Sequence, residues 1–217
     1  MGSITRSFAN NITTSGVLLP ASLNNNSIAN VTAYNASVAT GNMVLISSQT
    51  ASNSASISFT TGIDSTYKEY QFWFVNIHPR TNGVDISFQG STNGGSSYGV
   101  AITSSAFEVF HDEADTNTGL SYQGGSDLAQ STSYQLVSNF VGNDADKSAS
   151  GIITLFNPAS TTYVKHFISQ FSRVAQNDYN GNNFSAGYFN TTSAINAIDF
   201  KMSSGNFDGT ILMYGIK

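Results

Sequence analysis

Two alternating segments between Tyr67 and Tyr98 constrain the fold more than any other part of the chain. The first segment, 68–77, has apolar residues on both faces, with Tyr70, Phe72 and Phe74 on one and Gln71, Trp73, Val75 and Ile77 on the other. This pattern predicts a β-strand that is buried over most of its length. The second segment, 84–89, alternates Val84, Ile86 and Phe88 with Asp85, Ser87 and Gln89. It predicts a strand with one solvent-exposed face.

The residues between these segments contain two signals for a reversal of the chain, Pro79 and Asn82-Gly83. Proline has no N–H to donate to a β-ladder, and Asn-Gly readily adopts the positive φ that a tight turn requires. The two segments are therefore predicted to pair as a β-hairpin that the rest of the chain covers or extends.

Strand-like segments recur from Met43 to the C-terminus with turn residues between them. Besides the two above, they are 43–46, 56–59, 100–102, 107–110, 120–123, 134–141, 151–156, 163–174, 194–202 and 210–216. No window of helical length carries an apolar stripe with a 3.6-residue period. The predicted fold is therefore all-β, a two-sheet antiparallel sandwich over residues 43–217.

The alternation also predicts which side chains lie between the sheets. They are Phe72, Phe74, Ile86, Phe88, Ile153, Leu155, Phe167, Phe200, Leu212 and Tyr214. Because apolar residues continue almost to Lys217, the last segment is predicted to be an internal strand of a sheet.

Residues 1–42 differ from the rest of the chain, since they are rich in Asn, Ser, Thr and Ala and have only short apolar islands. Such a segment cannot build a core of its own, and it is predicted to be an extended arm that becomes ordered on the main domain or on a partner chain. The residues predicted to make these assembly contacts are Phe8, Val17, Leu18, Leu19 and Tyr34.

The low charge of the chain limits its partners. Only 10% of the residues are charged, and the net charge is -5. Eight scattered Lys and Arg residues cannot form a basic stripe, so no nucleic-acid partner is expected. No apolar run reaches membrane-spanning length, and no membrane insertion is expected. Weak repulsion between copies favours a homo-oligomer.

Chemistry-bearing residues are sparse, and neither a catalytic motif nor a cofactor is expected. The densest titratable cluster is 111–115, and its favoured interpretation is a solvated acidic loop. The alternative is a Ca²⁺ site formed by Asp112, Glu113 and Asp115, completed by backbone carbonyls and waters. No histidine has a partner at metal-ligand spacing. Trp73 is interpreted as a core or interface anchor in preference to a platform for stacking sugars.

The segment 179–189 is predicted to be a loop that mixes aromatic residues with Asn and Gly. Its aromatic residues are Tyr179, Phe184, Tyr188 and Phe189. Aromatic faces and amide groups are the surfaces that bind sugars, although such loops are also ordinary connections in a sandwich. This segment and the loop region 107–127 are the candidate sites for a glycan or another partner.

Several segments resemble a family of bacteriophage and prophage virion proteins, including versions from marine phages. The first is ISFTTGIDSTYKEYQFWFVNIHP, with the spaced residues Ile57, Phe59, Ile63, Tyr67 and Lys68. The others are the turn with Gly95 and Tyr98, the segment LFNPASTTYVKHFISQF, and the terminal strand that ends in Tyr214, Gly215, Ile216 and Lys217. The resemblance covers about residues 44–217.

The resemblance implies a jelly-roll-like sandwich on the surface of a virion, as a tail fibre, a tail appendage or a head decoration. It implies no catalytic residues, and it suggests a trimer that contacts other virion proteins. The protein would be assembled in the host cytoplasm. The alternative function is that of an adhesin that binds a host-surface glycan. A polysaccharide-degrading tailspike is disfavoured, because the chain lacks the repeats of a β-helix.

Overall fold

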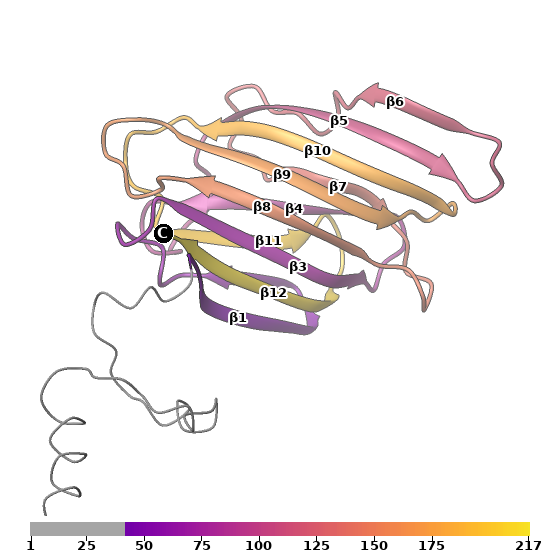
Figure 1. Cartoon of the computed structure of the whole chain (residues 1–217), viewed down its shortest axis with the longest axis horizontal. Coiled ribbons are helices and arrows are strands. Elements are labelled where there is room, and N and C mark those ends of the chain that lie inside the picture. Colours follow the sequence, from indigo (N-terminus) through magenta and orange to yellow (C-terminus); the bar gives the residue numbers. More distant parts are fainter. Residues whose placement is uncertain (1–41) are drawn as a thin grey trace, which may run out of the picture. The chain divides into compact units, whose positions relative to one another are not determined.

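Twelve β-strands make up the regular structure of residues 42–217, which are the residues that the computed structural model describes (Figure 1). They are β1 (Met43–Ser54), β2 (Ser56–Phe59), β3 (Glu69–Pro79), β4 (Val84–Ser91), β5 (Ile102–Asp112), β6 (Thr118–Tyr122), β7 (Gln135–Val141), β8 (Ala149–Phe156), β9 (Lys165–Val174), β10 (Tyr179–Phe189), β11 (Ala197–Met202) and β12 (Phe207–Ile216). The prediction of an all-β fold is confirmed. Since this part of the chain contains no helix, it contains no helix able to cross a membrane.

The strands form two antiparallel sheets. The larger has eight strands in the order β1-β12-β3-β8-β9-β10-β5-β6, and the smaller has four in the order β2-β11-β4-β7. In Figure 1 the larger sheet faces the viewer and the smaller sheet lies behind it. The predicted two-sheet sandwich is confirmed, with the apolar side chains of both sheets buried between them.

Phe200 of β11 lies at the centre of an aromatic core. Its ring contacts those of Phe59, Phe72, Phe74 and Phe88, with centroids 5.0 to 6.4 Å apart. These contacts join both sheets, because Phe72 and Phe74 belong to β3 of the larger sheet. Edge-to-face packing of this kind adds to the stabilisation that comes from burial alone.

Eight of the ten predicted core residues are buried, and the prediction is wrong for Leu212 and Tyr214. On β12 the buried side chains are instead those of Ile211 and Met213. Both faces of this strand are apolar, so alternation alone cannot say which face points inward. The prediction that β12 is internal is confirmed, since it pairs with β1 and β3.

The predicted hairpin between the two alternating segments is wrong. Strand β3 pairs with β12 and β8 in the larger sheet, whereas β4 pairs with β11 and β7 in the smaller sheet. The connection crosses between the sheets, and hydrogen bonds from the Arg80 N–H to the Asn206 carbonyl (2.8 Å) and from the Gly83 N–H to the Val141 carbonyl (2.9 Å) hold it. A turn signal specifies a reversal of the chain and not the partner of the strand that follows.

A bulge in β3 corrects the predicted position of Ile77. The register shifts between Phe74 and Ile77, and Asn76 has a φ of 50°. The extra residue turns the Ile77 side chain inward, where it is buried, and leaves Val75 exposed on the opposite face. This strand is therefore buried on one face only.

The polar face predicted for β4 is not solvent-exposed at Ser87 and Gln89, which are both buried. The Ser87 hydroxyl donates to the Lys201 carbonyl at 3.0 Å, and the Gln89 amide donates to the Thr132 and Ser133 carbonyls at 3.1 and 2.9 Å. The residues that precede β7 thus cover this part of the smaller sheet. Hydrogen bonds to backbone carbonyls make the burial of polar side chains tolerable.

The segment 179–189 is a strand and not the predicted loop. As β10 it pairs along its length with both β5 and β9, near the middle of the larger sheet. Asn and Gly have low β-propensity, but two flanking strands override that preference. The predicted segments 100–102 and 107–110 likewise belong largely to one strand, β5, which begins at Ile102.

Candidate functional site

The outer face of the larger sheet, which points away from β2, β11, β4 and β7, carries many apolar side chains. One row of directly paired residues crosses all eight strands, and it is apolar or aromatic except at Gln170 and Ser48. The row runs Tyr122, Phe107, Phe184, Gln170, Ile152, Trp73, Leu212 and Ser48. Phe107 is 44% exposed and Tyr122 is 62% exposed, so water reaches much of this row.

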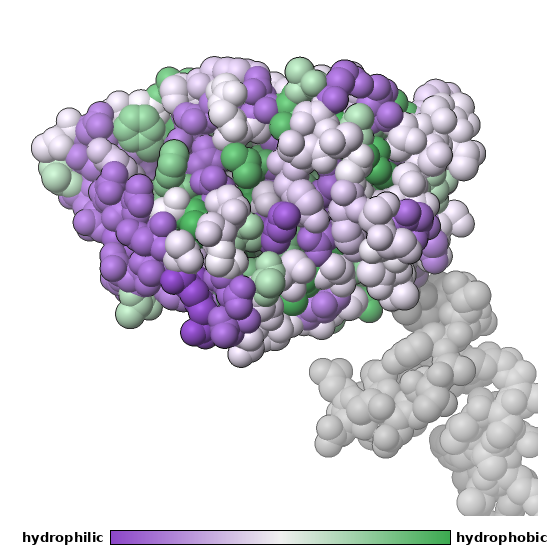
Figure 2. Space-filling model, turned by 180° about the vertical axis from the view of Figure 1, so that it is seen from behind, coloured by the Kyte–Doolittle hydropathy of each residue, from purple (hydrophilic) through white to green (hydrophobic). Residues whose placement is uncertain are grey.

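The neighbouring row on the same face is also uncharged. It runs Ser105, Ala186, Ile168, Thr154, Gln71, Tyr214 and Leu45. Ile168, near its middle, is 55% exposed. On the opposite side of the molecule, by contrast, hydrophobic residues are scattered among hydrophilic ones (Figure 2).

Aromatic pairs connect neighbouring strands on this outer face. Phe107 and Phe184 are stacked, with centroids 4.8 Å apart and planes 11° apart, and the rings of Trp73 and Tyr214 are 5.5 Å apart. The Trp73 Nε1–H donates to Gln71 Oε1 at 3.0 Å, which satisfies the polar edge of the indole. Trp73 is therefore not a core residue, and its interpretation as an interface anchor remains a prediction.

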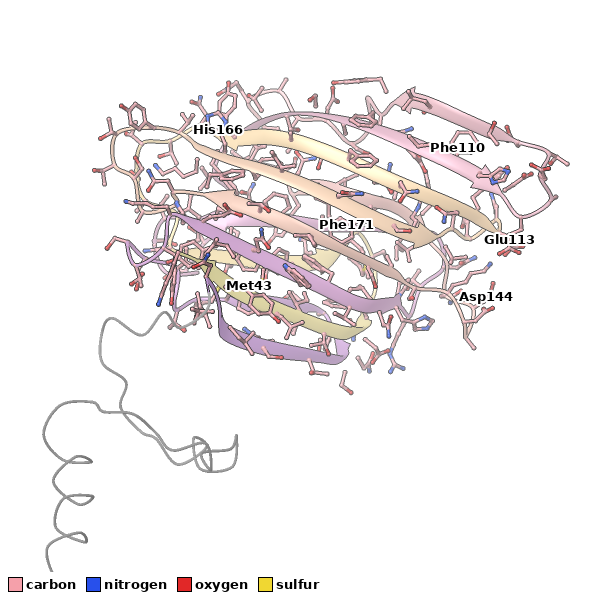
Figure 3. All side chains as sticks on the ribbon, in the orientation of Figure 1. Met43, Phe110, Glu113, Asp144, His166 and Phe171 are labelled. Atoms are coloured by element: carbon pink, nitrogen blue, oxygen red, sulfur yellow. The ribbon has the colours of Figure 1, made fainter. Side chains whose placement is uncertain are left out.

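A cavity of about 330 Å³ forms a second candidate site, at the end of the sandwich where β9 passes into β10. Its lining includes Glu108, Phe110, Asn117, Phe140, Arg173 and Tyr179. Figure 3 labels Phe110 and Glu113 at this end of the molecule. The Phe110 and Tyr179 rings meet edge to face, with centroids 5.7 Å apart and an interplanar angle of 69°. All of these residues belong to the larger sheet and its loops except Phe140, which belongs to β7 of the smaller sheet.

A buried ion pair forms part of the cavity lining. Arg173 Nη2 lies 2.6 Å from Glu108 Oε1, and the two side chains are 4% and 9% exposed. The guanidinium occupies the space beside Gly181, where a Cβ would collide with Nη1. Nε and Nη1 of Arg173 are buried and have no hydrogen-bond partner among residues 42–217. Such unpaired donors are costly inside a protein, and their presence in a native fold calls for an explanation.

Phe140, beside the cavity, has an unfavourable backbone conformation. Its φ is 49°, in the left-handed region that bulky residues avoid, and its side chain is 52% exposed. Two hydrogen bonds hold it there: its N–H donates to Asp85 Oδ1 at 2.9 Å, and its carbonyl accepts from the Gln176 N–H at 3.1 Å. Residues held in this way often belong to functional sites.

The structure does not bring together the four aromatic residues of 179–189. Tyr179 lines the cavity, and Phe184 and Tyr188 lie on the outer face. Phe189 is completely buried and contacts Phe88 and Phe167 in the core. Successive side chains of a strand point to opposite faces, so Tyr179 and Phe189 lie on one face of β10 and Phe184 and Tyr188 on the other.

The acidic cluster forms the turn between β5 and β6. Asp112 accepts hydrogen bonds from the Thr116 and Asn117 N–H groups at 2.8 and 3.0 Å, and bonding to Thr116 is the main reason why the pKa of Asp112 is lowered. Asp115 instead contacts His111 Nε2 at 3.0 Å, and Glu113 is exposed. Within 42–217, no three acidic or histidine side chains are grouped so that they could hold a metal ion.

Phe8, Val17, Leu18, Leu19 and Tyr34, the predicted contacts of the arm, lie outside the described residues. The sequence pattern did not lead us to predict the buried ion pair of Glu108 and Arg173, although the position of Arg173 along its strand indicated a buried charge. Arg173 has the same parity as Phe167 and Phe171 along its strand, which places its charge among inward-pointing side chains.

Comparison with known proteins adds no relative, because no protein-family model, curated protein or solved structure matches this chain.

Proposed function

We propose that this protein is a non-catalytic structural protein of a bacteriophage particle, which packs against copies of itself and against neighbouring virion proteins. The observation that carries this proposal is the pair of uncharged rows on the outer face of the larger sheet, with their exposed aromatic and aliphatic side chains. Exposed apolar surface of this extent is typical of a binding surface.

The outer face is large enough for a stable interface. Eight strands spaced by about 4.8 Å, with an average length of some 30 Å, span on the order of 1,000 Å². A standard protein interface buries about 800 Å² on each partner. Because neither row carries a charged residue, two copies that pack through these rows do not repel each other there.

The resemblance of the strand segments to phage virion proteins supplies the biological setting. It supports a place on the particle as a tail fibre, tail appendage or head decoration, a trimeric assembly, and assembly in the host cytoplasm. The proposal also includes contacts with other chains through residues 1–42, whose sequence contains short apolar islands.

The proposal is tested by introducing charge into the outer face. Ile168→Lys places an ammonium group on an exposed residue at its middle, and Thr92→Lys adds the same charge on an exposed turn after β4 as a control. We expect the unmodified full chain and the control to be oligomeric by light scattering, and Ile168→Lys to shift toward monomer with an unchanged circular dichroism spectrum. A monomeric unmodified chain, or an Ile168→Lys variant as oligomeric as the control, would refute assembly through this face.

A second candidate function, binding of a host-surface glycan, is favoured by one specific observation. The cavity beside Glu108 and Arg173 combines aromatic walls with polar groups, as sites for small polar ligands do. Incorporation into particles without binding to host cells would support the structural role alone.

A further inference from the structure

The cavity between β5, β9, β10 and β7 offers two kinds of surface to a ligand. Phe110, Tyr179 and Phe140 supply aromatic rings, and Glu108, Arg173 and Asn117 supply polar groups. Its volume of about 330 Å³ lies at the lower end of the range for small-ligand sites, which is roughly 300 to 1,000 Å³. A space of this size suits one or two rings of a small molecule.

The polar groups match a ligand rich in hydroxyl groups. The ion pair engages one carboxylate oxygen of Glu108, Oε1, which leaves the other oxygen to accept from a hydroxyl. The amide of Asn117 both donates and accepts hydrogen bonds, as does that of Gln176. The unpaired Nε and Nη1 of Arg173 show that this end of the core has hydrogen-bonding capacity that residues 42–217 do not satisfy.

The charges around the cavity disfavour an anionic ligand. Arg173 is neutralised by Glu108, and an adjoining hollow, which shares Asn177 and Tyr179 with the cavity, is lined by Asp112, Glu113 and Asp178. Asp178 is paired with Lys147 at 2.6 Å, but no salt bridge within residues 42–217 neutralises Asp112 or Glu113. These two carboxylates create a negative potential that repels carboxylate, sulfate or phosphate groups. The ligand that fits this setting is therefore neutral.

Phe140 gives the cavity an aromatic wall from the opposite sheet. Its left-handed backbone conformation would suit Asn or Gly better than Phe, so the residue is unfavourable for the fold itself. The Phe140 ring can pack against a sugar, because the apolar C–H face of a sugar ring stacks on aromatic side chains.

We infer that this cavity binds the end of a neutral carbohydrate chain, with sugar rings packed against Phe140 and Tyr179 and hydroxyl groups bonded to Glu108 and the surrounding amides. The inference does not depend on how the protein assembles. The strand residues that line the cavity alternate with those of the outer face, so the two sites lie on opposite sides of the larger sheet.

The test uses the full chain on an array of immobilised neutral and acidic oligosaccharides, followed by calorimetric titration of the best neutral ligand as a free oligosaccharide. Phe140→Asn removes the aromatic wall and keeps a residue that tolerates positive φ, so it should fold at least as well as the unmodified chain. Tyr179→Ser removes the second wall. Tyr163→Asn, on an aromatic residue that is 71% exposed outside this cavity, is the matched control.

We expect binding to neutral glycans, competition by the free oligosaccharide, and a loss of affinity of about tenfold or more for Phe140→Asn and Tyr179→Ser with no loss for the control. The inference is overturned if the full chain binds no neutral glycan, if acidic glycans bind more tightly, or if Phe140→Asn binds as well as the unmodified chain. None of these outcomes affects the light-scattering test of assembly, so the two proposals fail independently.

Discussion

The buried pair of Glu108 and Arg173 leads to a prediction in which two substitutions together do less harm than either one alone. The perturbations are Arg173→Met, Glu108→Leu and the double variant. Each single substitution leaves one charged side chain buried without its partner, because the two side chains are only 4% and 9% exposed and meet at 2.6 Å.

The expected magnitudes follow from this burial. Removing one partner of a buried ion pair typically costs about 3–5 kcal/mol of folding free energy. Replacing both partners by apolar residues of similar volume is often neutral or stabilising, because no charge then has to be removed from water. The two unpaired nitrogens of Arg173 strengthen this expectation, since Arg173→Met also removes them.

Urea unfolding at neutral pH measures the effect, followed by circular dichroism and by the fluorescence of Trp73, the single tryptophan. We expect the double variant to unfold within about 1 kcal/mol of the unmodified chain, and both single variants several kcal/mol below it. The double variant should also bind no neutral glycan, because it lacks Glu108. If the costs of the single substitutions simply add in the double variant, the pair stabilises the fold on its own and the reasoning is wrong.

Two further predictions concern the core and the response to acid. Phe200→Ala should lower the free energy of unfolding by about 3–5 kcal/mol, because it empties the space between four other rings. The control Tyr163→Ala, at an exposed site, should change it by less than about 0.5 kcal/mol. Equal urea midpoints for the two variants would contradict the central place of Phe200. The pKa values of three carboxyl groups are lowered chiefly by hydrogen bonds: Asp64 by Thr66, Asp112 by Thr116 and Asp208 by Arg80. These carboxylates therefore stabilise the fold at pH values above their unfolded pKa of about 3.9. They lose that contribution as the pH falls through their pKa values in the folded protein. The urea midpoint should therefore fall between about pH 5 and pH 2, and a midpoint that stays constant over this range would show that the three hydrogen-bonded carboxyls do not matter.

The sequence by itself determined the fold class and most of the strands. Period-2 alternation in 68–77 and 84–89, and its recurrence to the C-terminus, is a local property that only β-structure satisfies. The core residues followed wherever one face of a strand was clearly more apolar than the other, as at Phe72, Phe167 and Phe200.

What only the tertiary structure decided was which strands pair and which faces meet. The turn after Pro79 could have joined β3 and β4 in one sheet, but each strand finds its partners elsewhere in the chain, and such long-range pairing leaves no local signal. The candidate sites depend on that pairing. The neighbouring strands β9, β10 and β5 place Arg173 beside Gly181 and within ion-pair distance of Glu108. The rows of the outer face consist of residues far apart in the sequence, and they form one continuous surface only because the hydrogen-bond register aligns them.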